Sequence, residues 1–456
     1  MLGQGMMLGF PSCLLPALLE GDSGIKTDLE TASWLASSVG LSSVIGFLSS
    51  SYLMEPCGRR AAFALATTPG ALGWLLVYFA ADVPALMLGR ILGGISGGAT
   101  VTLAAIVLGE YTSPENRGMF LNLKSAFVCV GSMAVHILNN YFDWRNIALI
   151  ALFPFVTAFG VVCSWDESPS WLASKGYLEK SEDVFFNLRG RTERTYQEFT
   201  DLLKLQKEQL AKQSCSKFKS VGNFCSTLTK KQFMKPLLIV VVSSILSEFS
   251  GRHIFPAYAS QIIGEITGDK TQSFYYTLSI DVIITSSITF SSVLVRIMKR
   301  RILLLSTGLL SFLVLISVCV YLHFTPKDSV SSNNTWIPLC LLVIYFIVAN
   351  LACTPFPYII IGEIFPLVHK GIGAAVTGIF LSLLLMIALK ITPFLLTTLS
   401  VDGTFSIFAV VIGICLVVLY FILPETKDKT LPEIEKMNID DIEGPGYKAV
   451  EREIIN

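Results

Sequence analysis

Residues 84–118 read PALMLGRILGGISGGATVTLAAIVLGEYTSPENRG, an apolar run that ends in a polar segment containing Glu110 and Arg117. The apolar run, 84–108, is long enough to cross a bilayer, because about 20 residues of helix span the roughly 30 Å of hydrocarbon. The polar segment has a counterpart later in the chain, where Glu363 and Lys370 have the same spacing. An apolar span followed by a charged turn, present twice, predicts a membrane protein with an internal repeat.

Composition favours the same class of protein. The 456 residues are 52% hydrophobic and 15% charged, whereas soluble domains are typically about 25% charged. Lys+Arg and Asp+Glu both total 34. The chain therefore has no excess of basic residues of the kind that binds nucleic acid, and nucleic acid is excluded as a partner. Membrane lipid is the expected surrounding.

Similar apolar runs recur along the whole chain, and each predicts a transmembrane helix because lipid cannot satisfy free backbone groups. Twelve are expected, over 2–19, 32–53, 61–81, 84–108, 119–141, 146–164, 234–258, 272–296, 302–323, 336–361, 372–397 and 403–423. The first run is interrupted by Pro11 and Pro16. A signal peptide is its alternative interpretation, but a basic region before it is missing, and a shortened first helix is favoured.

The basic residues of the short loops predict the orientation. With both termini cytoplasmic, the inner loops hold Arg59, Arg60, Arg117, Arg296, Lys299, Arg300, Arg301 and Lys370. The outer loops hold only Lys26, Arg145, Lys270 and Lys327. Under this topology the sequon at Asn333 lies outside, where it is accessible to glycosylation.

The polar stretch 166–233 divides the spans six and six. We predict an N-terminal half (1–165), a cytoplasmic linker (166–233), a C-terminal half (234–423) and a cytoplasmic tail (424–456). The linker has the apolar spacing of amphipathic helices, with a solvated linker as the alternative.

Charged residues recur in the same order at the inner ends of both halves. The set comprises Arg59, Arg60, Glu110, Arg117, Glu167, Arg300, Arg301, Glu363, Lys370 and Glu425. Acidic groups facing arginines there would form a latch that opens when the halves move, as in alternating access. The alternative is that each basic loop only follows the positive-inside tendency.

Several separated motifs carry a family resemblance over nearly the whole chain. They are Gly58-Arg59-Arg60, LGRILGGISGG (88–98), GEYTSPENRG (109–118), ESPSWL (167–172), TPFPYIIIGEIFP (354–366) and PETKDKTLPEIE (424–435). Together they resemble the sugar porters of the major facilitator superfamily, and in detail the facilitated glucose and trehalose carriers of animals. The resemblance implies an all-α major facilitator fold of twelve helices, a small sugar-like solute, and Pro355 and Pro357 as a gating hinge in the tenth helix.

The sugar-contacting positions that the resemblance implies differ from the family pattern. They are Ser125, Ser247, Glu248, His253, Asn350 and Tyr358. Each unmatched buried polar group costs about 1–3 kcal/mol, so these differences should change which ligand fits, and glucose is not assumed. Glu248 and Arg252, one turn apart, form either part of a solute or proton pathway or a structural pair that pins the helix.

Three further charges interrupt apolar spans. Lys124 is expected to extend towards the interface, whereas Asp281 and Lys390 have no assigned role. Proton-coupled members of the family carry an acid in the first helix, where this chain reads Gly9-Phe10-Pro11-Ser12. Facilitated diffusion is therefore favoured over proton symport.

The leading hypothesis is a multi-pass carrier of a sugar-like solute, expected in the plasma membrane. A sugar receptor without flux and an inactive carrier remain alternatives. No nucleophile, base and orienting acid come together to indicate an enzyme. The ten cysteines form no CxxC pair and the four histidines lack metal spacing, so neither a metal nor a cofactor is expected. The oligomeric state is left open.

Overall fold

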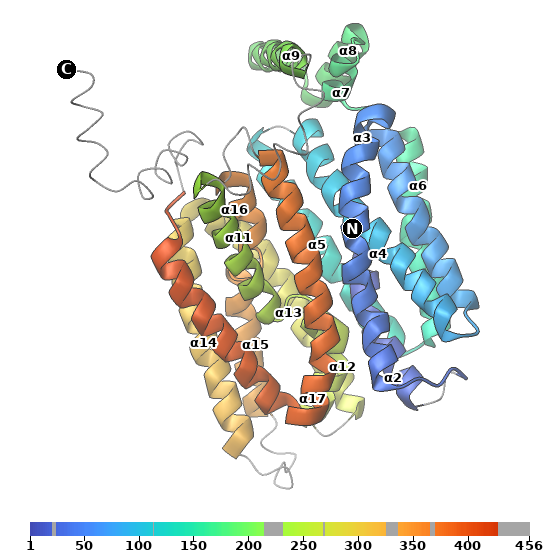
Figure 1. Ribbon diagram of the computed structural model, residues 1–456, viewed down its shortest axis with the longest axis vertical. Coiled ribbons are helices and arrows are strands. Elements are labelled where there is room, and N and C mark those ends of the chain that lie inside the picture. The colour runs from blue at the N-terminus through green and yellow to red at the C-terminus, as the bar shows by residue number, and fades with distance from the viewer. Residues whose placement is uncertain are drawn as a thin grey trace, which may run out of the picture. The chain divides into compact units, whose positions relative to one another are not determined.

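The computed structural model describes residues 1–20, 24–112, 114–213, 231–267, 270–324, 336–364 and 370–426. Within these ranges all of the regular structure is helical. The helices are α1 (Leu2–Gly9), α2 (Pro11–Glu20), α3 (Leu29–Phe79), α4 (Val83–Tyr111), α5 (Pro114–Asn139), α6 (Trp144–Ser164), α7 (Pro169–Ser174), α8 (Leu178–Arg189), α9 (Glu193–Gln213), α11 (Lys231–Phe249), α12 (Ile254–Thr267), α13 (Lys270–Ile297), α14 (Arg300–Phe324), α15 (Trp336–Leu351), α16 (Phe356–Ile364) and α17 (Lys370–Ile422) (Figure 1).

Ten helical segments of the described chain are long and apolar enough to cross a membrane, and α5 adds the shorter apolar helix Leu123–Asn139. The longest segment, Val376–Ile422, covers two expected spans. Its backbone breaks at Ser400, where φ is 60°. With that segment counted as two spans, the structure agrees with the twelve expected.

Several spans expected to be continuous are interrupted. The first is divided into α1 and α2 at Phe10, because Pro11 has no N–H to continue the helical bonding. The seventh is divided between α11 and α12 around Gly251, where φ is 89°. The tenth is divided between α15 and α16 just before Phe356. Conversely, the second and third spans form the single element α3, which breaks at Gly58.

The chain forms two compact units. Unit 1 contains residues 1–218, 253–292 and 385–401, and unit 2 contains 219–252, 293–384 and 402–456. Within unit 1, α3 and α4 pack at backbone distance. A Cβ on Gly98 would lie 2.2 Å from the carbonyl oxygen of Ser43, and one on Gly94 would lie 2.6 Å from that of Val39. These glycines thus serve close helix packing, as is common in membranes.

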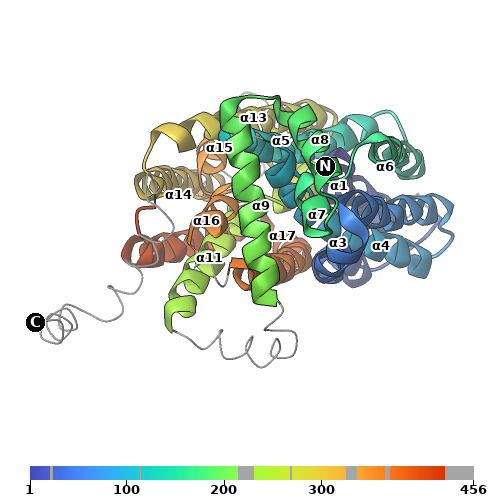
Figure 2. The same ribbon diagram turned by 90° about the horizontal axis from the view of Figure 1, so that it is seen from above.

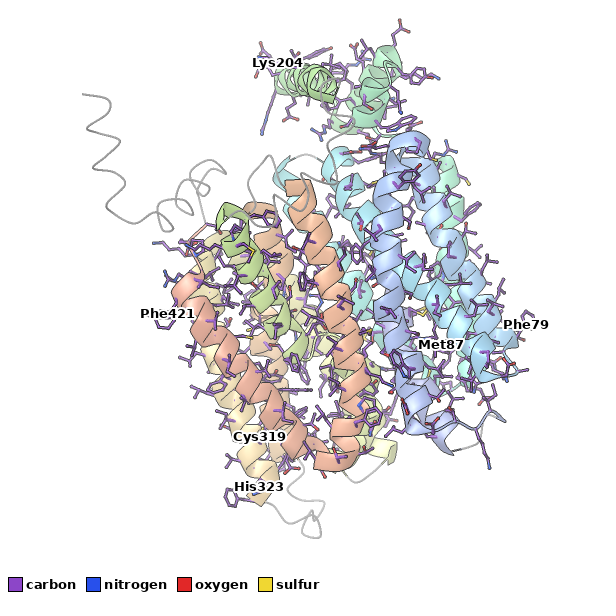
Figure 3. All side chains as sticks on the ribbon, in the orientation of Figure 1. Phe79, Met87, Lys204, Cys319, His323 and Phe421 are labelled. Carbon is purple, nitrogen blue, oxygen red and sulfur yellow. The ribbon has the colours of Figure 1, made fainter. Side chains whose placement is uncertain are left out.

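Large apolar side chains are exposed on both units, as expected of helices surrounded by lipid. Phe79 of α3 is 74% exposed and Phe421 of α17 is 77% exposed. Figure 3 shows both rings pointing away from the helices that carry them.

Three helices of the linker follow α6 in unit 1. Phe185 and Phe186 of α8 pack against Phe199 of α9 in a separate apolar cluster. In turn, α7 contacts both α3 and α4. Figure 2 shows α7 beside the end of α3. The first of the linker helices, α7, therefore lies against the charged turns predicted to form the latch.

Candidate functional site

Arg59 and Glu110 form a bidentate ion pair in unit 1. The break at Gly58 places Arg59 at the start of the second part of α3, and Glu110 lies in the last turn of α4. Nε and Nη2 of Arg59 donate to the carboxylate over 2.9 and 2.6 Å. The side chains of Arg59 and Glu110 are only 18% and 16% exposed. Two parallel charge-assisted bonds fix both the distance and the orientation of this pair. We call these charged turns the rim: Gly58–Arg60, Glu110 and Glu167 in unit 1, and Lys299–Arg301 and Glu425 in unit 2.

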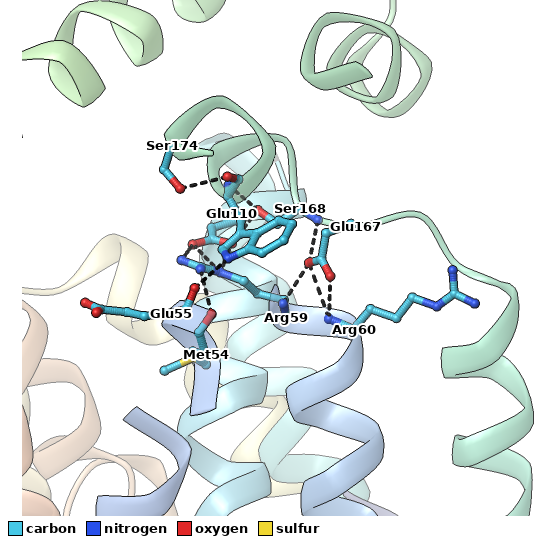
Figure 4. Close-up of polar contacts among 9 residues, drawn as sticks. Met54, Glu55, Arg59, Arg60, Glu110, Glu167, Ser168 and Ser174 are labelled. Atoms are coloured by element: carbon cyan, nitrogen blue, oxygen red, sulfur yellow. Dashed lines mark hydrogen bonds and ion pairs between the residues drawn. The ribbon is translucent and has the colours of Figure 1, made fainter. Parts of the chain in front are cut away.

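Glu167 binds backbone rather than side-chain groups. Its carboxylate accepts from the backbone N–H of Arg59 over 2.7 Å and from that of Arg60 over 3.2 Å (Figure 4). These N–H groups begin the second part of α3, and a helix N-terminus favours an anion. Gly58 adopts φ 86°, and a Cβ there would lie 2.4 Å from Oε2 of Glu167. The turn therefore requires glycine for both conformation and space.

Unit 2 repeats this arrangement. Glu425 accepts from the backbone N–H of Arg300 over 3.0 Å and from that of Arg301 over 3.1 Å. These are the first two residues of α14. The Arg301 guanidinium donates to the Tyr420 carbonyl over 2.7 Å, as the Arg60 guanidinium donates to the Cys163 carbonyl. The contact of the acid with the start of a helix, one of the three repeated charged positions, therefore recurs in each unit.

The linker helices bind the rim of unit 1. Ser168, the N-cap of α7, donates to Glu110 over 2.6 Å, and the Trp171 indole donates to the Glu55 carbonyl over 3.0 Å. Arg189 of α8 donates to the carbonyls of Glu110 and Thr112 over 3.2 and 2.9 Å. The end of α4 is therefore held by both helices.

Four of the predicted latch or modification residues are not described with side chains. Arg117 lies in α5, Glu363 lies in α16 and Lys370 begins α17, but their side chains lie outside the described part. Asn333 lies outside the described residues altogether. Their contacts, and the latch itself, stay predictions.

A polar cluster in unit 2 forms where the tenth span is interrupted. With α15 ended, the Thr354 carbonyl accepts from Ser247 over 2.9 Å and from Arg252 over 2.8 Å. The Arg252 guanidinium also lies over the ring of Tyr358, 4.3 Å from its centroid. Asn350 accepts from Thr354 over 2.9 Å. The break thus supplies a free backbone acceptor for the side chains of α11 and the turn after it.

The six predicted solute-contacting residues are divided between the units. Ser247, Glu248, Asn350 and Tyr358 belong to unit 2, and Glu248 is only 1% exposed. Ser125 on α5 and His253 just before α12 belong to unit 1. Pro355 precedes α16 and Pro357 is its second residue, so both expected hinge residues lie at the interruption. The hinge role itself stays a prediction.

Sequence reasoning missed a buried arginine in unit 1. Arg90 of α4 is 1% exposed and donates to the carbonyls of Leu35 over 3.1 Å and Met7 over 2.8 Å. It thereby joins α4 to α3 and α1. The sequence did contain a sign of it, because Arg90 is a cation inside an apolar span. Such a cation is costly to bury without partners and usually has a function.

Unit 1 also contains contacts between the first six spans and the last six. Ser260 donates to the Ser12 carbonyl over 3.1 Å. Lys390 donates to Ser33 over 2.8 Å and lies over the Trp34 ring, 4.2 Å from its centroid. Because α3 begins and α12 ends near outer loops in the expected topology, we expect these contacts to lie on the outer side.

The chain is similar to known proteins in family, sequence and fold. The family model for "Sugar (and other) transporter" matches residues 20–437. Facilitated trehalose transporters Tret1 of Bombyx mori and Polypedilum vanderplanki are each 26% identical to the chain. The alignments cover 94% of this chain and 84% and 85% of those proteins.

Solved structures give the same fold. The proton:xylose symporter XylE of the major facilitator superfamily, bound to 6-bromo-6-deoxy-D-glucose, matches with a TM-score of 0.74, covering 96% of this chain and 97% of that one. The inward-open conformation of XylE from E. coli matches with a TM-score of 0.73. Identity is 17% in both cases, so the likeness concerns the fold. It confirms the all-α, twelve-helix major facilitator fold.

Proposed function

The chain belongs to the sugar (and other) transporter family, and on that premise we propose that it carries a small polyhydroxylated solute across the membrane by alternating access. The observation that carries the proposal is the repeated rim, in which Glu167 and Glu425 each bind two backbone N–H groups at corresponding turns. Transporters of this design move two repeated bundles about a site near the bilayer midplane.

The proposed halves are 1–165 and 234–423, with the 166–233 linker and the 424–456 tail on the cytoplasmic side. This places the Arg59–Glu110 pair, which joins α3 to α4 within the first half, at the inner surface. The plasma membrane is the proposed location, with Asn333 in an outer loop. Transport without covalent chemistry is proposed, so the protein is not expected to be an enzyme.

The proposed solute site includes the polar cluster around Tyr358. Tyr358 offers a ring face, Asn350 and Ser247 offer hydrogen-bonding groups, and Arg252 lies against the ring. Aromatic faces with a few placed polar groups are typical of sites for small molecules. Trehalose is the first candidate because the Bombyx mori relative is named for its transport; hexoses and glycosides follow.

Facilitated diffusion is the proposed mode. The first span, Leu2–Leu19, contains no Asp or Glu, so it offers no carboxylate for proton coupling. The alternative of proton symport is favoured by one observation, the buried carboxylate of Glu248 on α11. A carboxylate within a span is a common proton relay.

The test is uptake of labelled trehalose and glucose into oocytes expressing the full chain. We expect saturable uptake that stops at equal inner and outer concentrations. Accumulation above that level, abolished by a protonophore and by Glu248→Gln, would establish symport instead. Binding of a sugar without any uptake by surface-expressed protein would identify a receptor and overturn the proposal.

A further inference from the structure

His136 and Asp281 form a buried pair within the membrane part of unit 1. His136 lies in the last turn of α5 and Asp281 lies in α13. Nδ1 of the imidazole is 2.5 Å from Oδ2 of the carboxyl group, and the side chains are 4% and 5% exposed. Nε2 is 3.0 Å from the carbonyl oxygen of Pro256 in α12. The imidazole therefore joins three helices.

The contacts of the ring dictate where its protons lie. A carbonyl oxygen only accepts, so Nε2 carries a hydrogen and donates it to Pro256. Nδ1 then faces the carboxyl oxygen of Asp281, and the two atoms need a proton between them. It is held either as imidazolium and carboxylate or as neutral imidazole and carboxylic acid. Without it, two lone pairs would meet at hydrogen-bond distance in a dry site.

No third charged side chain takes part in the hydrogen bonds and ion pairs described for His136 and Asp281. Asp281 is the one charged side chain acting on His136 there. The helix α1, which packs against α5, carries no titratable side chain. On the neighbouring elements, Arg90 of α4 interacts with Cys13 of α2 and Tyr258 of α12 instead. The pair therefore needs its own proton to be neutral overall.

The position of the pair connects this proton to conformation. His136 lies close to the end of α5 at Asn139, and an outer loop follows in the expected topology. It belongs to the first six spans, whereas Asp281 and Pro256 belong to the last six. If the halves separate on the outer side during alternating access, the imidazole must leave the carboxyl group.

We propose that His136 and Asp281 form a proton-binding site that closes the outer side of the carrier. Closing takes one proton from the outer solution, and opening returns it to the same side. The proton balance of a full cycle is therefore zero, which is compatible with facilitated diffusion. The inference rests on the proposed function, since alternating access supplies the opening step.

The direction of the pH effect follows from the proton balance. In acid, an open carrier already has a protonated imidazole, so closing takes up no proton. As the outer pH rises, the proton that closing must take up becomes scarcer. The equilibrium between the open and closed states therefore shifts towards the open state by up to about tenfold for each pH unit. The closed state is thus lost in alkaline solution, and transport should fall there.

The test is sugar uptake by oocytes at outer pH values between about 6 and about 9, the range around histidine titration. Wild-type uptake should fall towards alkaline outer pH. Asp281→Asn should lose the alkaline fall in uptake, because its amide N–H donates to Nδ1 with no added proton. Lys390→Gln breaks another contact between the halves without removing the proton site, so it should keep the wild-type pH dependence. Alkaline inhibition in Asp281→Asn, or a flat wild-type profile, would overturn the proposal.

A second measurement keeps the pair testable if no sugar is carried. In protein with ¹⁵N-labelled histidine, the short bond between Nδ1 and Oδ2 should give a strongly downfield proton resonance coupled to Nδ1. The signal should vanish in both His136→Gln and Asp281→Asn. Its absence from correctly inserted wild-type protein would contradict the proton site, whereas its presence without any flux would contradict only the proposed transport.

Discussion

Glu167 and Glu425 make equivalent contacts in the two repeats, because each carboxylate accepts hydrogen bonds from backbone N–H groups at the start of a helix. The sequence predicted that acids and arginines would meet at these turns. It did not predict that the acids would bind N–H groups, since a motif shows residue types but no hydrogen-bond geometry. Arg59 and Glu110 do form the expected side-chain pair.

Glu425→Ala should therefore destabilise the protein and reduce transport. Loss of two charge-assisted bonds removes about 1.5–3 kcal/mol for each bond that water does not replace. The measurements are thermal unfolding in detergent and sugar uptake at matched surface expression. Glu425→Gln keeps an acceptor and should retain part of both. Wild-type stability and flux in Glu425→Ala would remove this contact from the latch.

Gly58→Ala should disturb the first repeat selectively. The new Cβ would both occupy a left-handed backbone position and collide with the Glu167 carboxylate. A strain of about 1–3 kcal/mol is expected, seen as a lower unfolding temperature.

Lys299→Ala is the matched control, because Lys299 occupies the corresponding position of the second repeat. Among the described residues, Ser400 is the only non-glycine residue with positive φ, so Lys299 has an ordinary backbone conformation. Equal destabilisation by both substitutions would contradict the special role of Gly58.

At the scale of elements, the apolar runs were sufficient to place the spans but not their interruptions. Length and hydropathy show whether a segment can cross the bilayer. Because hydropathy is averaged over the whole segment, a break of a single turn does not show in it. Pro355 marked the break before α16, whereas Gly251 was not recognised as marking the break before α12. The contact of His136 with Asp281 joins residues far apart in sequence, which periodicity along one chain cannot reveal.

Pro355→Ala tests whether the interruption of the tenth span serves transport. An alanine N–H would let the end of α15 continue towards α16, so the segment should become straighter and less able to bend. We expect a several-fold lower maximal rate of uptake with little change in KM. Pro338→Ala, in the first turn of α15, removes a proline where no helical bond is lost and should leave uptake normal. Equal uptake by both variants would exclude the hinge.

At the scale of the whole molecule, unit 1 contains segments from both sequence repeats, whereas unit 2 contains no part of the first repeat. Unit 1 contains the first six spans together with residues 253–292 and 385–401 of the second repeat. Its internal contacts, from Ser260 to Ser12 and from Lys390 to Ser33, lie on the side that we assign to the exterior. A carrier that alternates must break these contacts and form them again in each cycle.

Counterflow tests this cycle most directly. Vesicles containing the protein are loaded with unlabelled trehalose and diluted into a trace of labelled trehalose. A site that opens alternately to the two sides predicts a transient accumulation of label above its outer concentration, because unlabelled solute competes for exit. Simple equilibration without an overshoot, in vesicles that take up trehalose, would contradict alternating access.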